Sequence, residues 1–436
     1  MKTKLKNALS AGNLIKTVSK AARKVINRTT NIKPSISLHD CLMSGLALFK
    51  LKYPSLLQFD KDRLDPVRSN NLKNLFHVDR APSDTALRER LDAVDPQLIR
   101  PLFKKVFAVA QRNKVLESFE YMNDAYLCSI DGTGYFSSSK IHCKNCCVKT
   151  LKDGSKTYYH QMLCAVLVHP NQQHVIPFCP EAIQKEDGST KNDCERNASK
   201  RLLKDLKREH PHLKLIIVED SLASNAPHIK LLEELGYQYI LGVKPKDHKW
   251  LFDWVAASSS DIKESTDVDG NQHKFSYVND APLNASNEDV RINFLEHWET
   301  RPNGKVIHHT WVTNVALTDG NVTQVMKGGR ARWKVENETI NTLKTQEYNF
   351  GHNFGHGKAN LSYVLAQLMM LAFLIDELGF LACRFVKSAK QVLLGKKRMW
   401  RVIRETFCFF YIANWEIFFE CLIHGIKRGE LLPDTS

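Results

Sequence analysis

The chain has 436 residues, with 62 lysines and arginines against 47 aspartates and glutamates, which gives a formal net charge of +15 at neutral pH. Hydrophobic residues make up 43% of the chain and charged residues 25%, a balance that excludes a disordered chain, a collagen and a coiled-coil rod. The basic excess favours a polyanionic partner, nucleic acid first and an anionic membrane second.

The first 35 residues are basic, with no acidic residue before Asp40. Apolar residues recur beside the lysines and arginines at roughly helical spacing. Three interpretations stay open: a helix that contacts phosphate, a solvated helix face, and a membrane-surface or targeting helix. The segment lacks the unbroken apolar core of a secretory signal, so we expect a cytoplasmic, nucleoid-associated protein.

Residues 36–120 carry apolar side chains three and four positions apart, the spacing of amphipathic helices. Prolines punctuate the pattern, and the stretch DPVRSNN, which begins at Asp65, is typical of a loop. We expect a small all-helical domain.

A different pattern begins at Ala125. The run YLCSI predicts a short strand that ends on Asp131, and LKLIIVED predicts another that ends on Asp220. Strand-like runs and a helix-favouring segment over residues 192–209 lie between them, and a helix and a strand follow. This alternation predicts an α/β fold with a mixed sheet.

Residues 251–325 alternate polar and apolar side chains between turn signals, which predicts an antiparallel β insertion. Helical patterns return after it and continue to the end of the sequence. Two apolar stretches there, residues 361–375 and 407–426, are too short or too interrupted by polar residues to span a bilayer. We expect buried helices and no membrane partner.

Three acids stand out by their placement. Asp131 and Asp220 each end a predicted strand, where open α/β sheets place ligands, and Glu336 lies one turn after Arg332 on a predicted helix. Mg²⁺ and Mn²⁺ prefer such carboxylate oxygens, together with waters and substrate phosphates. The alternative is that each acid is a solvated turn residue. Glu219 and Glu338 are neighbouring acids expected to point away from the site.

The order of these residues resembles the IS4-type DDE transposases over residues 121–375, most specifically in RWKVENE around Arg332 and Glu336. The resemblance implies a ribonuclease-H-like mixed sheet with a β-rich insertion, preceded by a small all-helical domain and followed by helices. It also implies catalytic Asp131, Asp220 and Glu336 that hold Mg²⁺ or Mn²⁺. The implied activity is cut-and-paste transposition, in which water and then a DNA 3′-hydroxyl attack phosphodiesters.

The resulting expectation for the chain is a division into six segments: a basic arm (1–35), a helical DNA-binding domain (36–120), the first part of the core (121–250), the β insertion (251–325), the second part of the core with the catalytic helix (326–380) and a helical C-terminal region (381–436).

The sequence departs from the IS4 pattern on the catalytic helix. That pattern has a Tyr three positions before the Arg and a Lys seven after the Glu, where this chain has Gly329 and Leu343. Lys344 comes one residue late, which on an α-helix turns it by about 80° from Glu336.

Double-stranded DNA, as transposon terminal inverted repeats and target, is the partner that the resemblance implies, with a homodimer bringing two ends together. Basic or histidine side chains near Glu336 are the expected DNA contacts: Arg330, Arg332, Lys334, Lys344, His352 and His356. The two histidines belong to a glycine-rich stretch that is also compatible with an ordinary loop. Trp250 and Trp311 lie in or beside the insertion. For each of them we favour packing in the core over stacking on a DNA base.

Eleven cysteines without a secretory context argue against a disulfide framework. Cys143 and Cys146 have the spacing of a zinc half-site, and His160 and Cys164 are the nearest further ligands. The two interpretations are a structural zinc site that includes Cys143, Cys146 and His160, and reduced cysteines packed between strands.

Two other functions remain compatible with these features. One is a ribonuclease-H-like nuclease without strand transfer, which only a joined DNA product would distinguish from a transposase. The other is a catalytically inactive DNA-binding derivative, which would bind DNA with a strong salt dependence and show no metal-dependent cleavage.

Overall fold

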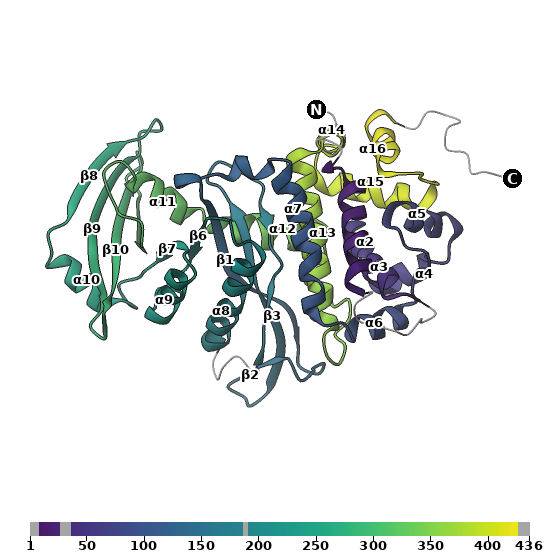
Figure 1. The fold of residues 1–436 in the computed structure, drawn as a ribbon, viewed down its shortest axis with the longest axis horizontal. Helices are drawn as coiled ribbons and strands as arrows, with labels where there is room; N and C mark the ends of the chain where they lie inside the picture. Colours follow the sequence, from purple (N-terminus) through teal and green to yellow (C-terminus); the bar gives the residue numbers. More distant parts are fainter. Residues whose placement is uncertain (1–7, 27–35, 186–190, 426–436) are drawn as a thin grey trace.

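The computed structural model describes residues 8–26, 36–185 and 191–425. Helices from both ends of the chain form one bundle, and the middle of the chain forms a sheet with helices packed on it (Figure 1). The mixed α/β class is confirmed. The bundle and the strands of the insertion lie on opposite sides of the central strands (Figure 1).

The helices of the bundle come first and last in the chain. They are α2 (Ala11–Ile26), α3 (Leu38–Lys50), α4 (Leu56–Asp62), α5 (Pro66–Phe76), α6 (Asp84–Asp92), α7 (Arg100–Arg112), α13 (Leu361–Ala382), α14 (Arg384–Val392), α15 (Lys396–Phe409) and α16 (Trp415–His424). Short 3₁₀ turns connect α6, α7 and the sheet: η1 (Pro96–Leu98), η2 (Val115–Phe119) and η3 (Met122–Asp124).

Helix α2 is the described part of the basic N-terminal segment. Its apolar side chains, among them Leu14, Ile15 and Val18, are buried, and α2 packs against α3, α5 and α7. Its charged side chains, such as Lys16 and Lys20, are exposed. The described part of the arm is therefore built into the bundle with its basic face toward solvent.

The stretch DPVRSNN belongs to helix α5, so the loop predicted there is wrong. The Asp65 carboxylate caps the helix by accepting from the Arg68 N–H at 3.0 Å, and Pro66 occupies the first turn. Both residues favour a helix start, because the cap satisfies an unpaired N–H and proline has no N–H to lose there.

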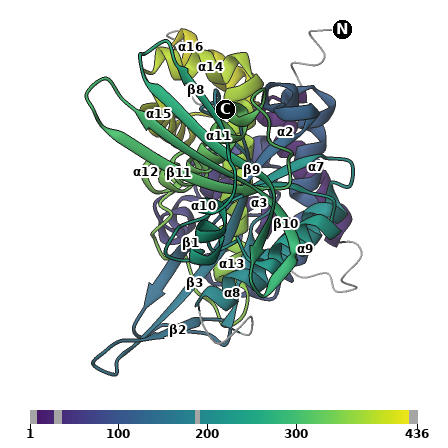
Figure 2. The same ribbon diagram turned by 90° about the vertical axis from the view of Figure 1, so that its left-hand side faces the viewer.

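Within the described residues, the sheet has eleven strands: β1 (Tyr126–Ser138), β2 (Cys147–Thr150), β3 (Lys156–Val168), β4 (Ile176–Pro177), β5 (Glu181–Ile183), β6 (Leu215–Glu219), β7 (Gln238–Gly242), β8 (Asp261–Thr266), β9 (Gln272–Asn284), β10 (Asn287–Thr300) and β11 (Val306–Thr313). Their order is β2-β3-β1-β6-β7-β11-β10-β9-β8, and β4 and β5 also pair with β3. Strands β1, β6 and β7 are parallel, whereas the other pairings are antiparallel. The β2–β3 hairpin projects from the body in both views (Figures 1 and 2).

The insertion continues this sheet. Strand β11 pairs with β7 in the register Trp311↔Gly242, and β10, β9 and β8 follow outward. The first residues of the predicted insertion instead form the end of helix α10 (Lys249–Ala256), since Leu251 and Val255 bury one face of a helical turn. The other helices on the sheet are α8 (Lys191–Glu209), α9 (Ala226–Glu234), α11 (Val322–Arg330) and α12 (Asn341–Thr345), with a π-helix, η5 (Val335–Ile340).

Strand β1 does not end at Asp131, as the sequence suggests, but continues to Ser138. The reason is its long antiparallel partner β3, which pairs with β1 from Leu127↔Val168 to Ser138↔Tyr158. The parallel neighbour β6 does end at Glu219. Asp131 therefore lies where the parallel part of the sheet ends, although its own strand goes on.

Helix α13 runs through the bundle and packs against α2, α3, α6 and α7. It is long and apolar enough to cross a membrane, but 94% of its most apolar window is buried inside the protein, as in a core helix of a soluble protein. Its buried Asp376 is paired with Lys50 and Lys52 and accepts a hydrogen bond from the Tyr348 hydroxyl.

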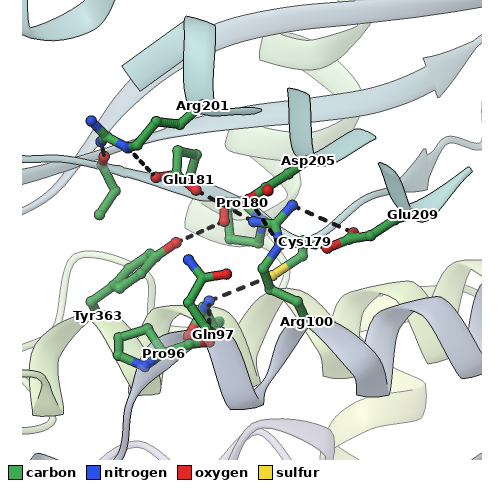
Figure 3. Close-up of polar contacts among 12 residues, drawn as sticks. Pro96, Gln97, Arg100, Cys179, Pro180, Glu181, Arg201, Asp205, Glu209 and Tyr363 are labelled. Carbon is green, nitrogen blue, oxygen red and sulfur yellow. Dashed lines mark hydrogen bonds and ion pairs between the residues drawn. The ribbon is translucent and has the colours of Figure 1, made fainter. Parts of the chain in front are cut away.

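A buried ion-pair cluster joins the bundle to the sheet (Figure 3). Arg100, at the start of α7, donates to Glu209 of α8 at 2.6 Å and to Glu181 of β5 at 3.3 Å. Asp205 of α8 lies 3.2 Å from the same guanidinium, and Arg201 donates to Glu181 from the other side at 2.8 Å. The cluster thus fixes α7 against β5 and α8.

Candidate active site

Asp131 and Asp220 are brought side by side by the parallel pairing of β1 and β6. Ser129 is in register with Val218, and the two aspartates come two residues later on their chains. Each carboxylate accepts from a nearby backbone N–H, Asp131 from Gly132 at 2.8 Å and Asp220 from Leu222 at 2.9 Å. Both line one cavity of about 30 Å³. That space suits a water or an ion rather than an organic substrate.

Glu336 lies on the π-helix η5, which packs against β1 and β3, and its negative charge acts on Asp131. The preceding segment is fastened to β1 by Arg332. Its guanidinium lies 3.3 Å from the Asp131 carboxylate, and its carbonyl oxygen accepts from the Ser129 hydroxyl at 3.0 Å. Single π turns inside helical segments occur frequently at functional sites.

The pKa of the Asp131 carboxyl reflects the charges that surround it. Burial raises the pKa of its carboxyl, and the negative charges of Glu336 and Asp220 raise the pKa further. Arg332 and the Gly132 N–H act in the opposite direction. Like charges gathered around a partly buried acid resist ionisation, and a divalent cation relieves that repulsion. Asp131, Asp220 and Glu336 carry carboxylate oxygens of the kind that Mg²⁺ and Mn²⁺ prefer, and Glu336 lies outside the cavity that the two aspartates line.

Glu195 of α8 is a further acid at this site that sequence reasoning missed. It lines the same cavity as the two aspartates. Its carboxylate sits 3.3 Å from where a Cβ on Gly132 would be, so the glycine makes room for it. The sequence places a helix over this segment, but no motif distinguishes Glu195 from the other charged residues of that helix.

The two neighbouring acids have other environments. Glu219 is buried, and its carboxylate is 2.7 Å from the Nε2 of His228 on α9. Glu338 is half-buried on η5, two residues after Glu336.

The residues expected to contact DNA are found in three environments. Arg330 is paired with Glu299 at 2.5 Å, and Lys334 donates to the Gln172 carbonyl at 2.6 Å. Both line a cavity of about 690 Å³ between the insertion strands and α11. Lys344 and His352 are exposed.

His356 is 6% exposed, and its ring nitrogens face protein atoms, so its imidazole offers no free donor to a phosphate. It joins Cys143, Cys146 and His160 in one cluster, and their ligand atoms all lie within 4.8 Å of one another. Cys164, the other ligand considered, is buried elsewhere on β3, opposite Asp131.

The aromatic side chains divide between core and surface. Trp311 is buried and packs on Gly329, and Trp250 is half-buried. Trp333, which sequence reasoning did not single out, is 52% exposed, and the guanidinium of Arg332 lies 5.0 Å from its ring centre. Its position within RWKVENE was the available signal.

Comparison with known proteins does not assign the chain to a family. No protein-family model matches the chain, and no curated protein sequence matches it. Among solved structures, the chain is similar to a piggyBac transposase in a synaptic complex with hairpin DNA. The TM-score is 0.40 at 10% sequence identity, over 100% of this chain and 86% of that chain. Similarity at that level does not establish a shared fold, so the functional argument depends on the residues of the site.

Proposed function

We propose that this protein is a metal-dependent DDE transposase of the IS4 type, which binds transposon ends and cleaves and rejoins DNA. The observation that carries the proposal is the placement of Asp131 and Asp220 at the end of the parallel strands, where Arg332 pairs with Asp131 and the charge of Glu336 acts on Asp131. The resemblance of the sequence implies two strand-borne aspartates and one helix-borne glutamate. The proposal is supported by Asp131 on β1, by Asp220 directly after β6 and by Glu336 on η5.

Asp131, Asp220 and Glu336 would hold the Mg²⁺ or Mn²⁺ ions. Ions held there would supply the Lewis acidity that phosphoryl transfer needs at the attacking and leaving oxygens. The chain's own residues do the rest. Arg332 holds positive charge beside Asp131, backbone N–H groups orient both aspartates, and the cavity admits water or an ion. The DNA itself has to lie outside this cavity, across the surface.

The π-helix η5 offers an explanation for Lys344, which comes one residue later than the lysine of the IS4 pattern. Each hydrogen bond of a π-helix spans one residue more than in an α-helix, so a π turn absorbs one extra residue. This π-helix contains Glu336 and ends before Lys344, and the two residues are eight positions apart where the IS4 pattern has seven. The extra residue is thus compatible with Lys344 acting as the lysine of that pattern, and Lys344 is exposed.

Binding of DNA is supported by charge. The chain carries +15 overall, and Lys327, Arg330 and Lys334 share one large cavity beside the insertion. Joining two transposon ends requires two active sites, which supports a homodimer in the synaptic complex. Sedimentation of the protein with and without end DNA would measure that dimer.

The test is cleavage and joining of DNA that carries the inverted repeats flanking the coding region. We expect wild-type protein to cut at the repeat ends and to form a joined product only with Mg²⁺ or Mn²⁺. Asp131→Asn, Asp220→Asn and Glu336→Gln should each abolish cleavage, whereas Glu338→Gln should retain it as the matched control.

The outcomes separate the competing functions. Cleavage without a joined product would show a nuclease, and salt-dependent binding without cleavage would show an inactive DNA-binding derivative. Undiminished cleavage by all three acid variants would overturn the proposed site.

A further inference from the structure

The Cys143–Cys146–His160–His356 cluster joins three separate parts of the chain. Cys143 and Cys146 belong to the connection between β1 and β2, His160 lies on β3, and His356 lies in the glycine-rich connection between α12 and α13. Cys146, His160 and His356 are buried, and Cys143 is half-buried. Cys143 and Cys146 are not joined in a disulfide, since their Sγ atoms are 3.8 Å apart, too far for that bond.

The distances in the cluster have the dimensions of a tetrahedral site. Zinc with two thiolate and two imidazole ligands requires about 3.8 Å between sulfurs, about 3.6 Å between sulfur and nitrogen and about 3.3 Å between nitrogens. The sulfurs are 3.8 Å apart and the two Nε2 atoms are 3.1 Å apart. Three of the four sulfur–nitrogen separations are 3.5 Å for Cys143–His160, 3.3 Å for Cys146–His160 and 3.3 Å for Cys146–His356, and the fourth, Cys143–His356, is within 4.8 Å.

The hydrogen bond of His356 also fixes the tautomer that a metal ligand requires. The Nδ1 of His356 lies 2.9 Å from the Gly357 carbonyl, which can only accept, so Nδ1 carries the proton and Nε2 presents a lone pair. That lone pair faces the Nε2 of His160 and the sulfur of Cys146. An outer hydrogen bond that fixes the tautomer is typical of metal-bound histidine.

We propose that these four side chains bind a structural Zn²⁺ ion. Two sulfur and two imidazole ligands in a tetrahedron favour Zn²⁺ over the oxygen-preferring Mg²⁺, Ca²⁺ and Mn²⁺. All four positions are filled by protein, as in structural rather than catalytic zinc sites. The site is also remote from the carboxylates, because His160 and the partner of Asp131 are four residues apart on β3, about 13 Å.

The ion fastens the glycine-rich connection to the sheet. Beside the cluster, the Asn145 side chain donates to the Ala359 carbonyl at 3.0 Å, a second link between the same two segments. The next residues begin α13, where the Asp92 carboxylate accepts from four successive N–H groups, those of Lys358 to Leu361. Gly357 is required there, because a Cβ would collide with Asp92 and its φ is +70°. Zinc would thus hold β1 and β3 in fixed relation to the start of the core helix.

The first experiment measures metal in untagged protein purified under reducing conditions without chelator. We expect stoichiometric zinc by mass spectrometry in the wild type. Cys146→Ser and His356→Ala should lose it, whereas Cys147→Ser and His142→Ala, which change the neighbouring cysteine and an exposed histidine outside the cluster, should keep it. The proposal does not depend on the proposed DNA chemistry, since no activity is measured.

If the ligand variants do not fold, a second measurement on the wild-type protein tests the proposal. Wild-type protein loaded with Co²⁺ should show the intense visible bands of a tetrahedral site and thiolate charge-transfer bands in the near ultraviolet. Removing the metal with a chelator should lower the melting temperature, and added Zn²⁺ should restore it. Folded wild-type protein that contains no zinc, and whose melting temperature does not respond to added Zn²⁺, would overturn the proposal.

Discussion

The guanidinium of Arg332 lies 3.3 Å from the carboxylate of Asp131, a residue 201 positions earlier in the chain. The same arginine accepts a hydrogen bond from Ser129 through its carbonyl oxygen, so both its backbone and its side chain hold it to β1. The ion pair is partly open to solvent, with side chains 17% and 21% exposed. Arg332 therefore both anchors the segment that leads into η5 and offsets the negative charge gathered at Asp131.

Arg332→Ala should slow DNA cleavage by about 10²-fold, the usual cost of removing a charge-stabilising donor. It should also move the acidic limb of the pH–rate profile to higher pH. Without the arginine, only the Gly132 N–H opposes the rise in the pKa of Asp131 that burial and the charges of Glu336 and Asp220 cause, so a higher pH is needed to ionise it. Arg332→Lys should shift the limb less. A profile unchanged in Arg332→Ala would show that the pair does not control Asp131.

Glu195→Gln should raise the Mg²⁺ concentration needed for cleavage by about tenfold, without abolishing the reaction, as expected for a group that supports the metal ligands. The carboxylate lines the cavity of Asp131 and Asp220, so its charge adds to the attraction for a cation. Titration of the cleavage rate with Mg²⁺ measures the effect. Glu234→Gln, an exposed acid at the end of α9, is the control and should leave the titration unchanged.

Local patterns identified the strand-borne acids, because an apolar run that ends in an aspartate is visible in a window of a few residues. The register that brings Asp131 beside Asp220 depends on the pairing of β1 with β6, which a single sequence does not reveal. Glu195 is harder to recognise from the sequence than the two aspartates. Its relevance arises from the missing Cβ of Gly132, 63 positions away, so no spacing within α8 signals it.

His356 shows how composition can mislead. Its setting among glycines, asparagines and a lysine is equally typical of a phosphate-binding loop and of a loop that approaches another segment closely. Its cysteine neighbour Cys146 is 210 residues earlier, so the fourth ligand of the cluster was outside any local motif. In α5 the local signals were sufficient. The Asp65–Pro66 helix start was present, but few apolar residues supported it.

Trp333→Ala should weaken binding of DNA with unpaired ends, because an exposed indole beside the active site can stack on a free base at about 1–3 kcal/mol per base. Trp333→Phe should retain most of the affinity. Both variants should keep the wild-type melting temperature, since half of the side chain is already in solvent. Phe409→Ala removes an exposed aromatic ring from α15, in the helical bundle, and should bind normally. Equal binding by Trp333→Ala and wild type would exclude the stacking role.

Arg100→Ala should lower the free energy of unfolding by about 3–5 kcal/mol, because it leaves Glu181, Asp205 and Glu209 without their shared buried cation. Arg208→Ala is the matched control. It pairs with the same Asp205 at 2.7 Å, but its side chain is 65% exposed, so solvent screens the pair and the expected cost is below about 1 kcal/mol. Urea denaturation at neutral pH compares the two variants, and similar losses would show that burial of the cluster is not what matters.

His210 should make stability fall in mild acid. Its ring packs against both Phe107 and Phe178, with centroids 4.4 Å and 5.1 Å away. Burial lowers its pKa from 6.5 to about 4, helped by the positive charges of Lys104 and Arg100. The unfolded chain therefore takes up a proton near pH 6.5 that the folded protein refuses until about pH 4. The stabilisation is complete above pH 6.5 and is lost as the pH falls toward 4, by up to about 3 kcal/mol.

His210→Phe keeps the aromatic packing and removes the titration, so its free energy of unfolding should fall less than that of the wild type between pH 7 and pH 4. His212→Gln, an exposed histidine two residues later, should follow the wild type. Urea denaturation at several pH values in this range gives the comparison. Because every other titrating group is common to both proteins, the difference between the His210→Phe and wild-type curves isolates this one proton. Curves that stay parallel would mean that His210 becomes charged as readily in the folded protein as in the unfolded chain.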